Sequence, residues 1–351
     1  MAWWVVIEHA VALGGYRDAP HWIFYDRETI GMYCLAGFFV LSGYLIYASR
    51  LNTSNAKQYF WRRFLRMFPG YWVCLLVIAL VIAPLSQVIA RAGSYDWGSG
   101  IGYVVWNSLL KINQLGIDGT LTEIRHPGVW NFSAWTLFWE FLLYIGLSLV
   151  VTFFGRHRAV VGLWLGLAAM AGFKIVLKLT LANGGVTHAT ETPHGFAANP
   201  IVTLGEPFAR LGCFFFMGAL LYHYRDRVRM TPLVVAVSAV VTFVLAIVGW
   251  LLVVGMLPFA IVLLRVGASP HATWLNHPND YSYGTYIYAF PITQTLAVWE
   301  LRHPMSQFWF CVCALVITAI AAWLSWHLVE KRALKLKNVR RRRRVPEPGV
   351  P

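Results

Sequence analysis

Charged side chains are scarce in this sequence of 351 residues. Asp, Glu, Lys and Arg together make up only 13% of it, whereas hydrophobic residues make up 58%. Soluble domains carry about 25% charged residues, so the composition excludes an ordinary water-soluble protein. Apolar runs of roughly 20 residues recur along the chain, and each is long enough to cross the hydrocarbon core of a bilayer. The sequence therefore predicts an all-α fold, a polytopic bundle of membrane-spanning helices.

Several common sequence signals are also lacking. No repeat with a period of about 20 to 50 residues is visible, which argues against a solenoid. The first apolar run has neither a basic start nor a cleavage site, so we expect no cleaved signal peptide. The five cysteines all fall in apolar runs without C-x-x-C spacing, so we expect packing residues and no metal site. They are Cys34, Cys74, Cys213, Cys311 and Cys313.

The apolar runs and the basic residues predict a topology. We expect ten spans, at residues 1–15, 29–48, 70–90, 134–154, 159–182, 201–222, 232–248, 250–264, 281–299 and 307–328. If the N-terminus is cytoplasmic, the inner segments and the C-terminal tail hold 20 of the 29 Lys and Arg residues, and the outer segments hold 6. Positive residues collect on the cytoplasmic side, so we expect both termini there.

The net charge of +14 comes mainly from the inner loops and the tail. We divide the chain into a membrane domain at 1–333 and a basic, disordered cytoplasmic tail at 334–351. Each basic residue near a membrane surface gains about 1 kcal/mol from anionic lipid. We therefore expect membrane lipid, and not nucleic acid, as the partner of this charge.

Ionisable residues inside membrane spans are costly and are candidates for function. Those within the predicted spans are Glu8, His9, Glu140, Lys174, Lys178, Glu206 and Arg210. The imidazole of His9 can move a proton near neutral pH, which makes it a candidate catalyst as well as a packing residue. Glu8 points about 100° away from it on a helix, so the two do not share a face.

The other intramembrane charges are spaced in pairs. Glu206 and Arg210 are four residues apart and can neutralise each other on one helix face. Lys174 and Lys178 are also four apart, near the outer end of their predicted helix, where long side chains can reach the interface. We expect these two lysines to extend their ammonium groups in this way.

Two polar clusters lie at the ends of spans. In KQYFWRRFLRMFPGYW, Arg63 and Arg66 lie one helical turn apart and offer forked donors that match phosphate oxygens. An interfacial helix that obeys the positive-inside rule is the alternative, and we expect Pro69 to end that helix. In NFSAWTLFWEFLLY, Glu140 enters a span and Tyr144 follows it by one turn. Such a carboxylate can accept a substrate hydroxyl or pair with a charged imidazole.

Six segments in order resemble acyltransferase family 3, the membrane proteins that include bacterial O-antigen and exopolysaccharide O-acetyltransferases. The segments are GFFVLSGYLI (37–46), RRFLRMFPGYW (62–72), WTLFWEFLLY (135–144), RLGCFFFMGALLY (210–222), YSYGTYIYAFPI (281–292) and LSWHLVEKRALKLK (324–337). The resemblance implies about ten membrane helices in a bacterial inner membrane. It also implies transfer of an acyl group, commonly acetyl from acetyl-CoA as donor substrate, to a hydroxyl of a glycan or related acceptor, with no bound cofactor.

The resemblance assigns roles to particular residues. His9 corresponds to the family's first-span histidine, and Arg63 and Arg66 to its arginine pair. The family's first-span arginine would lie three residues ahead of Met1, so we expect the native start to lie upstream. Ala289 stands where many relatives carry a histidine.

These assignments give a mechanistic hypothesis. Arg63 and Arg66 bind the phosphates of the acyl donor, and His9 acts as general base or, alternatively, as a transient acyl carrier. Glu140 is the second catalytic candidate, positioning the histidine or binding the acceptor. The candidate acceptor or oxyanion contacts are Tyr144, Glu206, Arg210 and Tyr286.

The acceptor stays open at this point. A surface glycan such as lipopolysaccharide or exopolysaccharide is implied most often, and a lipid-linked sugar, a nodulation-type oligosaccharide or a macrolide-like metabolite are alternatives. A secondary transporter that exports a glycan without chemistry is the alternative from another functional class, since ten spans with intramembrane charges suit it as well. A non-catalytic relative that assembles with a biosynthetic complex is the third.

Overall fold

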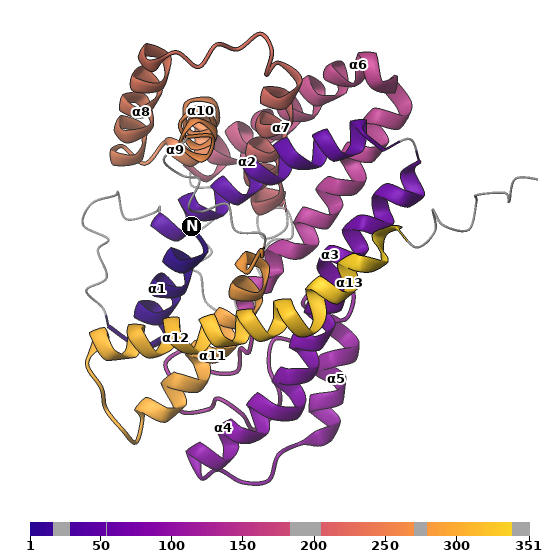
Figure 1. Cartoon of the computed structure of the whole chain (residues 1–351). Helices are drawn as coiled ribbons and strands as arrows, with labels where there is room; N and C mark the ends of the chain where they lie inside the picture. Colours follow the sequence, from indigo (N-terminus) through magenta and orange to yellow (C-terminus); the bar gives the residue numbers. More distant parts are fainter. Residues whose placement is uncertain (17–28, 54, 183–204, 270–278, 339–351) are drawn as a thin grey trace, which may run out of the picture. The chain divides into compact units, whose positions relative to one another are not determined.

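The computed structural model describes residues 1–16, 29–53, 55–182, 205–269 and 279–338. All regular structure in these ranges is helical, as predicted (Figure 1). The α-helices are α1 (Ala2–Leu13), α2 (Ile30–Leu51), α3 (Ala56–Val77), α4 (Ala83–Ala90), α5 (Trp97–Asn107), α6 (Trp135–Ala182), α7 (Glu206–His223), α8 (Pro232–Ile247), α9 (Leu251–Val254), α10 (Met256–Gly267), α11 (Ser282–Glu300), α12 (Gln307–Ser325) and α13 (Lys331–Lys335).

Four helical segments among these residues are long and apolar enough to cross a membrane. They are Ile30–Leu51, Ala56–Ala90, Phe132–Leu177 and Gln307–Lys335. Shorter apolar helices lie at Ala2–Leu13, Phe208–His223, Pro232–Ile247 and Met256–Gly267. The apolar, all-helical chain is an integral membrane protein. The number of crossings, the cytoplasmic termini and the division at residue 333 remain predictions.

The chain folds into two compact units. The first comprises Met1–Glu8, Tyr16–Ser54 and Thr136–Pro278, and the second comprises His9–Gly15, Asn55–Trp135 and Asn279–Pro351. Helix α1 therefore contributes its first residues to one unit and its last residues to the other. The candidate site residues also fall partly in one unit and partly in the other, so we describe each unit by itself.

Close packing of α2 against α7 is the main feature of the first unit. A Cβ atom added to Gly43 would collide with the carbonyl oxygen of Phe215, and one added to Gly218 would collide with that of Val40. Small residues at such positions let helix backbones approach closely inside a membrane. Both glycines lie in the quoted family-like segments, so these segments have a packing role.

Helix α6 consists of two helical parts. The backbone of Gly155 is non-helical, with φ 70° and ψ 166°, a conformation that favours glycine. This break lies between the two spans predicted at 134–154 and 159–182, so the prediction of separate helices there is confirmed.

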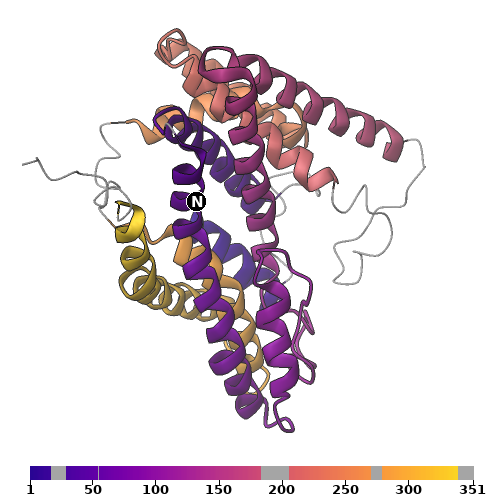
Figure 2. The same ribbon diagram turned by 90° about the vertical axis from the view of Figure 1, so that its right-hand side faces the viewer.

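The second unit contains a long helical rod. Helix α3, a π-helical turn at Ile78–Ile82 and α4 follow one another without a gap, as Figure 2 shows. Pro69 lies inside α3, so the prediction that it ends a short helix is wrong. Residues Leu65, Met67 and Tyr71 around the proline are buried, and the Tyr283 hydroxyl donates to the carbonyl of Met67 at 2.6 Å. This bond ties the turn that contains Pro69 to α11.

Helix α5 was not predicted, because residues 91–133 read as an outer loop. It begins at a capped end, where the side chain of Asp96 accepts from the backbone N–H of Ser99 at 3.0 Å. Its 11 residues are too few to cross a bilayer. The α3–α4 rod packs against this short helix and against α11, and α11 packs in turn against α12.

Candidate functional site

His9 belongs to the second unit and lies on α1 against α11. Its ring contacts that of Phe290 edge-on, with the centroids 5.3 Å apart and an interplanar angle of 72°. One helical turn further along α1, Leu13 packs with Phe290 and Val129 in a buried apolar cluster. His9 itself keeps part of its surface exposed. The imidazole is therefore packed against an aromatic ring of a neighbouring helix.

Glu8, the neighbour of His9, belongs to the first unit and has a structural role. Its carboxylate accepts a hydrogen bond from the backbone N–H of Gly31 in the first turn of α2. A Cβ atom on Gly31 would lie 2.7 Å from that carboxylate, so the close approach requires glycine. A negative charge at a helix N-terminus is favourable, because the first N–H groups carry a partial positive charge. Sequence reasoning had left Glu8 unexplained.

Glu140 lies in a polar cluster of the first unit. Its Oε1 atom accepts from the Ser42 hydroxyl at 2.7 Å and also from the Tyr144 hydroxyl. The predicted proximity of Glu140 and Tyr144 is thus confirmed. Ser42 was missed as a site residue, although it lies in the segment GFFVLSGYLI that carries the family resemblance. Two hydroxyl donors hold the carboxylate in one orientation.

Arg66 lies in an ionic cluster of the second unit. Its guanidinium pairs with Asp280 and lies 3.7 Å from Oε2 of Glu330, and it stacks 5.7 Å from the centre of the Tyr283 ring. The other carboxylate oxygen of Glu330 accepts from the Ser325 hydroxyl at 2.8 Å. Any phosphate that binds Arg66 must therefore compete with two carboxylates. Neither acidic residue was predicted as its partner.

Arg63 precedes Arg66 by one turn of α3 and keeps part of its surface exposed. Arg63 and Arg66 therefore lie on one helix, one turn apart, as predicted. Phosphate binding at this face remains a prediction.

Glu206 and Arg210 pair within α7 as predicted. The Nε atom of Arg210 lies 3.5 Å from Oε1 of Glu206. Lys174 does not extend to the interface: it is buried, and its ammonium donates to the carbonyl of Leu252 in α9. The prediction for Lys174 is wrong because a neighbouring helix supplies an acceptor inside the unit. The side chain of Lys178 lies outside the described residues.

Tyr286 is used to hold α11 in place. Its hydroxyl donates to the carbonyl of Ser133, and the Asn131 side chain donates to the carbonyl of Ile287 at 2.9 Å. Further along α11, the side chain of Gln294 donates to the carbonyl of Val129 at 2.7 Å. These three bonds fix the segment before α6 against α11. The Tyr286 hydroxyl thus has a backbone acceptor, and its contact with the acyl acceptor remains a prediction.

A resident metal centre finds no support in the described part of the chain. No group of three or more His, Cys, Asp or Glu side chains there has a metal-binding arrangement. The five cysteines are all free.

The apolar helices are those of a membrane protein, and comparison with known proteins shows that it is an acyl-transferring enzyme. A family model described as an acyltransferase domain matches residues 1–327, and the chain belongs to this family, acyltransferase family 3. The resemblance seen in the sequence segments is thereby confirmed. The transporter alternative is set aside.

Three named proteins are similar to this chain. An O-acetyl transferase of Shigella phage Sf6 is 25% identical over 337 residues, covering 94% of this chain and 92% of its own length. Nodulation protein 10 of Rhizobium leguminosarum bv. viciae is 24% identical over 330 residues, which cover 87% of this chain and 82% of that protein. Acyltransferase MdmB of Streptomyces mycarofaciens is 26% identical over 117 residues, which cover 33% of this chain and 27% of that protein. No solved structure matches the chain.

Proposed function

We propose that this protein is an O-acetyltransferase that moves an acetyl group from acetyl-CoA to a hydroxyl of a bacterial cell-surface glycan. The observation that carries the proposal is the acyltransferase-domain match over residues 1–327. Similarity over nearly the full length to an O-acetyl transferase supports acetyl as the group and oxygen as the acceptor atom. A nodulation-type oligosaccharide, which the family resemblance also allows, stays the alternative to a polysaccharide.

The proposed chemistry is a direct transfer with His9 as general base. The imidazole takes the proton of the acceptor hydroxyl while that oxygen attacks the thioester carbonyl. The carbon–sulfur bond then breaks, and the CoA thiolate receives the proton from the imidazolium. The packing of the His9 ring against Phe290, which orders the imidazole, supports this role.

The remaining roles are part of the same proposal. Glu140 is a catalytic carboxylate, supported by the two hydroxyl groups that orient it. Arg63 and Arg66 bind the phosphates of CoA, supported by guanidinium chemistry and their common helix. Arg210, paired with Glu206, is available to stabilise negative charge on the carbonyl oxygen.

The proposed topology completes the account. Ten spans with both termini in the cytoplasm of a bacterial cell place the basic segments on the side where CoA is found. The distribution of Lys and Arg between inner and outer segments supports this orientation.

The test is transfer of labelled acetyl from acetyl-CoA in membranes that contain the full chain. The acceptors are lipopolysaccharide, exopolysaccharide and chitin oligosaccharides freed of O-acetyl groups by mild base. We expect His9→Ala to lower the rate by about 100-fold or more, the range for loss of a general base. His157→Ala, which removes an exposed histidine elsewhere, is the matched control and should keep full activity. Equal rates for the two variants would refute the role of His9.

A further inference from the structure

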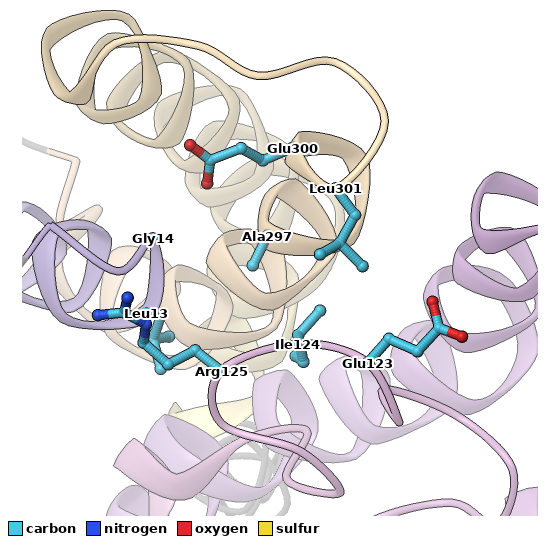
Figure 3. Close-up of a pocket in the computed structure, with 8 residues that line it drawn as sticks. All are labelled: Leu13, Gly14, Glu123, Ile124, Arg125, Ala297, Glu300 and Leu301. Atoms are coloured by element: carbon cyan, nitrogen blue, oxygen red, sulfur yellow. The ribbon is translucent and has the colours of Figure 1, made fainter.

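A cavity of about 370 Å³ opens in the second unit where α1 ends (Figure 3). Pockets for small molecules measure about 300–1,000 Å³, so this one suits a ligand of the size of one or two sugar rings. Its walls come from the end of α1, the segment before α6, and the end of α11. All three belong to the same unit.

The lining combines an apolar floor with three charged groups. Leu13, Ile124 and Ala297 are buried and supply the floor. Glu123, Arg125 and Glu300 also line the cavity. In Figure 3, Arg125 and Glu300 extend toward the side where α1 ends, and Glu123 extends away from them. A sugar ring has apolar C–H faces and a rim of hydroxyls that both donate and accept. Two carboxylates accept from such hydroxyls, and a guanidinium donates to them.

The charge of the cavity argues against the acyl donor as its ligand. Two carboxylates and one guanidinium leave one net negative charge around it. The phosphates of CoA carry several negative charges, and like charges in one site repel. An uncharged polyhydroxyl ligand meets no such penalty.

Arg125 lies against the turn that ends α1. Gly15 has φ +84°, and a Cβ atom there would lie 2.8 Å from the guanidinium carbon of Arg125. The guanidinium thus lies against the C-terminal end of α1, where unpaired carbonyls carry partial negative charge. The donor group of the cavity therefore lies beside the end of α1.

The cavity lies one helical turn from His9. Leu13, which lines it, follows His9 by four residues on the same face of α1, a rise of about 6 Å. Phe290 connects the two positions, because its ring contacts both the His9 ring and the Leu13 cluster. His9 itself does not line the cavity, so the cavity and the imidazole are neighbouring positions along α1.

We propose that this cavity is the acceptor site, and that it binds a neutral sugar residue of a glycan through Glu123, Arg125 and Glu300. The inference rests on the proposed function, since it names the place where the acceptor hydroxyl is presented to His9. The proposal also implies that the protein binds glycans at this cavity in the absence of the acyl donor.

The first experiment measures the KM values for both substrates of the acetyl transfer. Each hydrogen bond from a sugar hydroxyl to a charged group contributes about 1.5 kcal/mol, or roughly tenfold in binding. We expect Glu123→Ala with Glu300→Ala to raise the acceptor KM by about 100-fold and to leave the KM for acetyl-CoA unchanged. Asp118→Ala, which removes an exposed carboxylate from the same segment outside the cavity, is the matched control. An unchanged acceptor KM in the double variant would overturn the proposal.

The second experiment measures binding without chemistry. Fluorescent chitin tetrasaccharide and de-O-acetylated O-polysaccharide are titrated onto the purified full chain in lipid nanodiscs. If the wild-type protein transfers no acetyl but binds a glycan, and Arg125→Ala abolishes that binding, the proposed function fails and the cavity stands as a glycan site. If neither glycan binds, or Arg125→Ala binds as well as wild type, the cavity proposal fails whatever the activity.

Discussion

The ionic cluster around Arg66 allows its structural and functional roles to be separated. The side chain of Glu330 is only 2% exposed, and Arg66 is the cation beside it, at 3.7 Å. Removal of one partner of a buried ion pair leaves an uncompensated charge, which costs about 3–5 kcal/mol. Arg66 keeps 25% of its side chain exposed, and Ser325 still donates to Glu330. We therefore expect Arg66→Ala to destabilise the protein by about 3 kcal/mol, the lower end of that range.

A second change isolates the part of this loss that is structural. Arg66→Ala combined with Glu330→Gln removes both charges, and Ser325 can still donate to the glutamine carbonyl. We expect the double variant to recover most of the lost stability, as judged by thermal unfolding in detergent. It should not recover the KM for acetyl-CoA if Arg66 binds the donor. Equal stability of the single and double variants would refute the electrostatic reasoning, and a normal donor KM in the double variant would remove Arg66 from donor binding.

Three further predictions follow from single contacts. Gly43→Ala forces a methyl group into the carbonyl oxygen of a neighbouring helix, so we expect thermal unfolding to show a destabilisation of about 1–3 kcal/mol. The control is Gly146→Ala, where an added Cβ atom meets nothing within 4 Å, and this variant should unfold like wild type. Glu140→Gln retains an oxygen for the two hydroxyl donors, so we expect normal stability and a kcat lowered about 100-fold. A normal kcat would show that Glu140 has a structural role only. Glu8→Gln removes a negative charge from the start of α2, so we expect the free energy of unfolding to fall by about 0.5–1 kcal/mol, and by less at high salt. A loss of stability that does not depend on salt would contradict the electrostatic origin.

Local features of the fold were predictable from the sequence. Apolar runs located most of the helices, the break at Gly155 separates two predicted spans, and the four-residue spacing of Glu206 and Arg210 predicted their ion pair. The proximity of Glu140 and Tyr144 followed from the same helical periodicity. Each of these rests on residues that are neighbours in sequence.

The failures concern partners that are distant in sequence. The carbonyl that accepts from Lys174 lies 78 residues away, and the backbone N–H that binds Glu8 lies 23 residues away. Pro69 read as a helix end, because nothing in the sequence showed that Tyr283 would support its turn. The family resemblance located candidate catalytic residues, but it could not show which carboxylates would surround Arg66.

The central claim is that the protein joins an acetyl group to a glycan hydroxyl. The most direct test counts two products of one reaction, the O-acetyl esters formed on the glycan and the free CoA released from acetyl-CoA. We expect one ester for each CoA in membranes with the wild-type chain, and neither product above background with His9→Ala. Release of CoA without ester on any glycan, or no release with any acceptor, would contradict it.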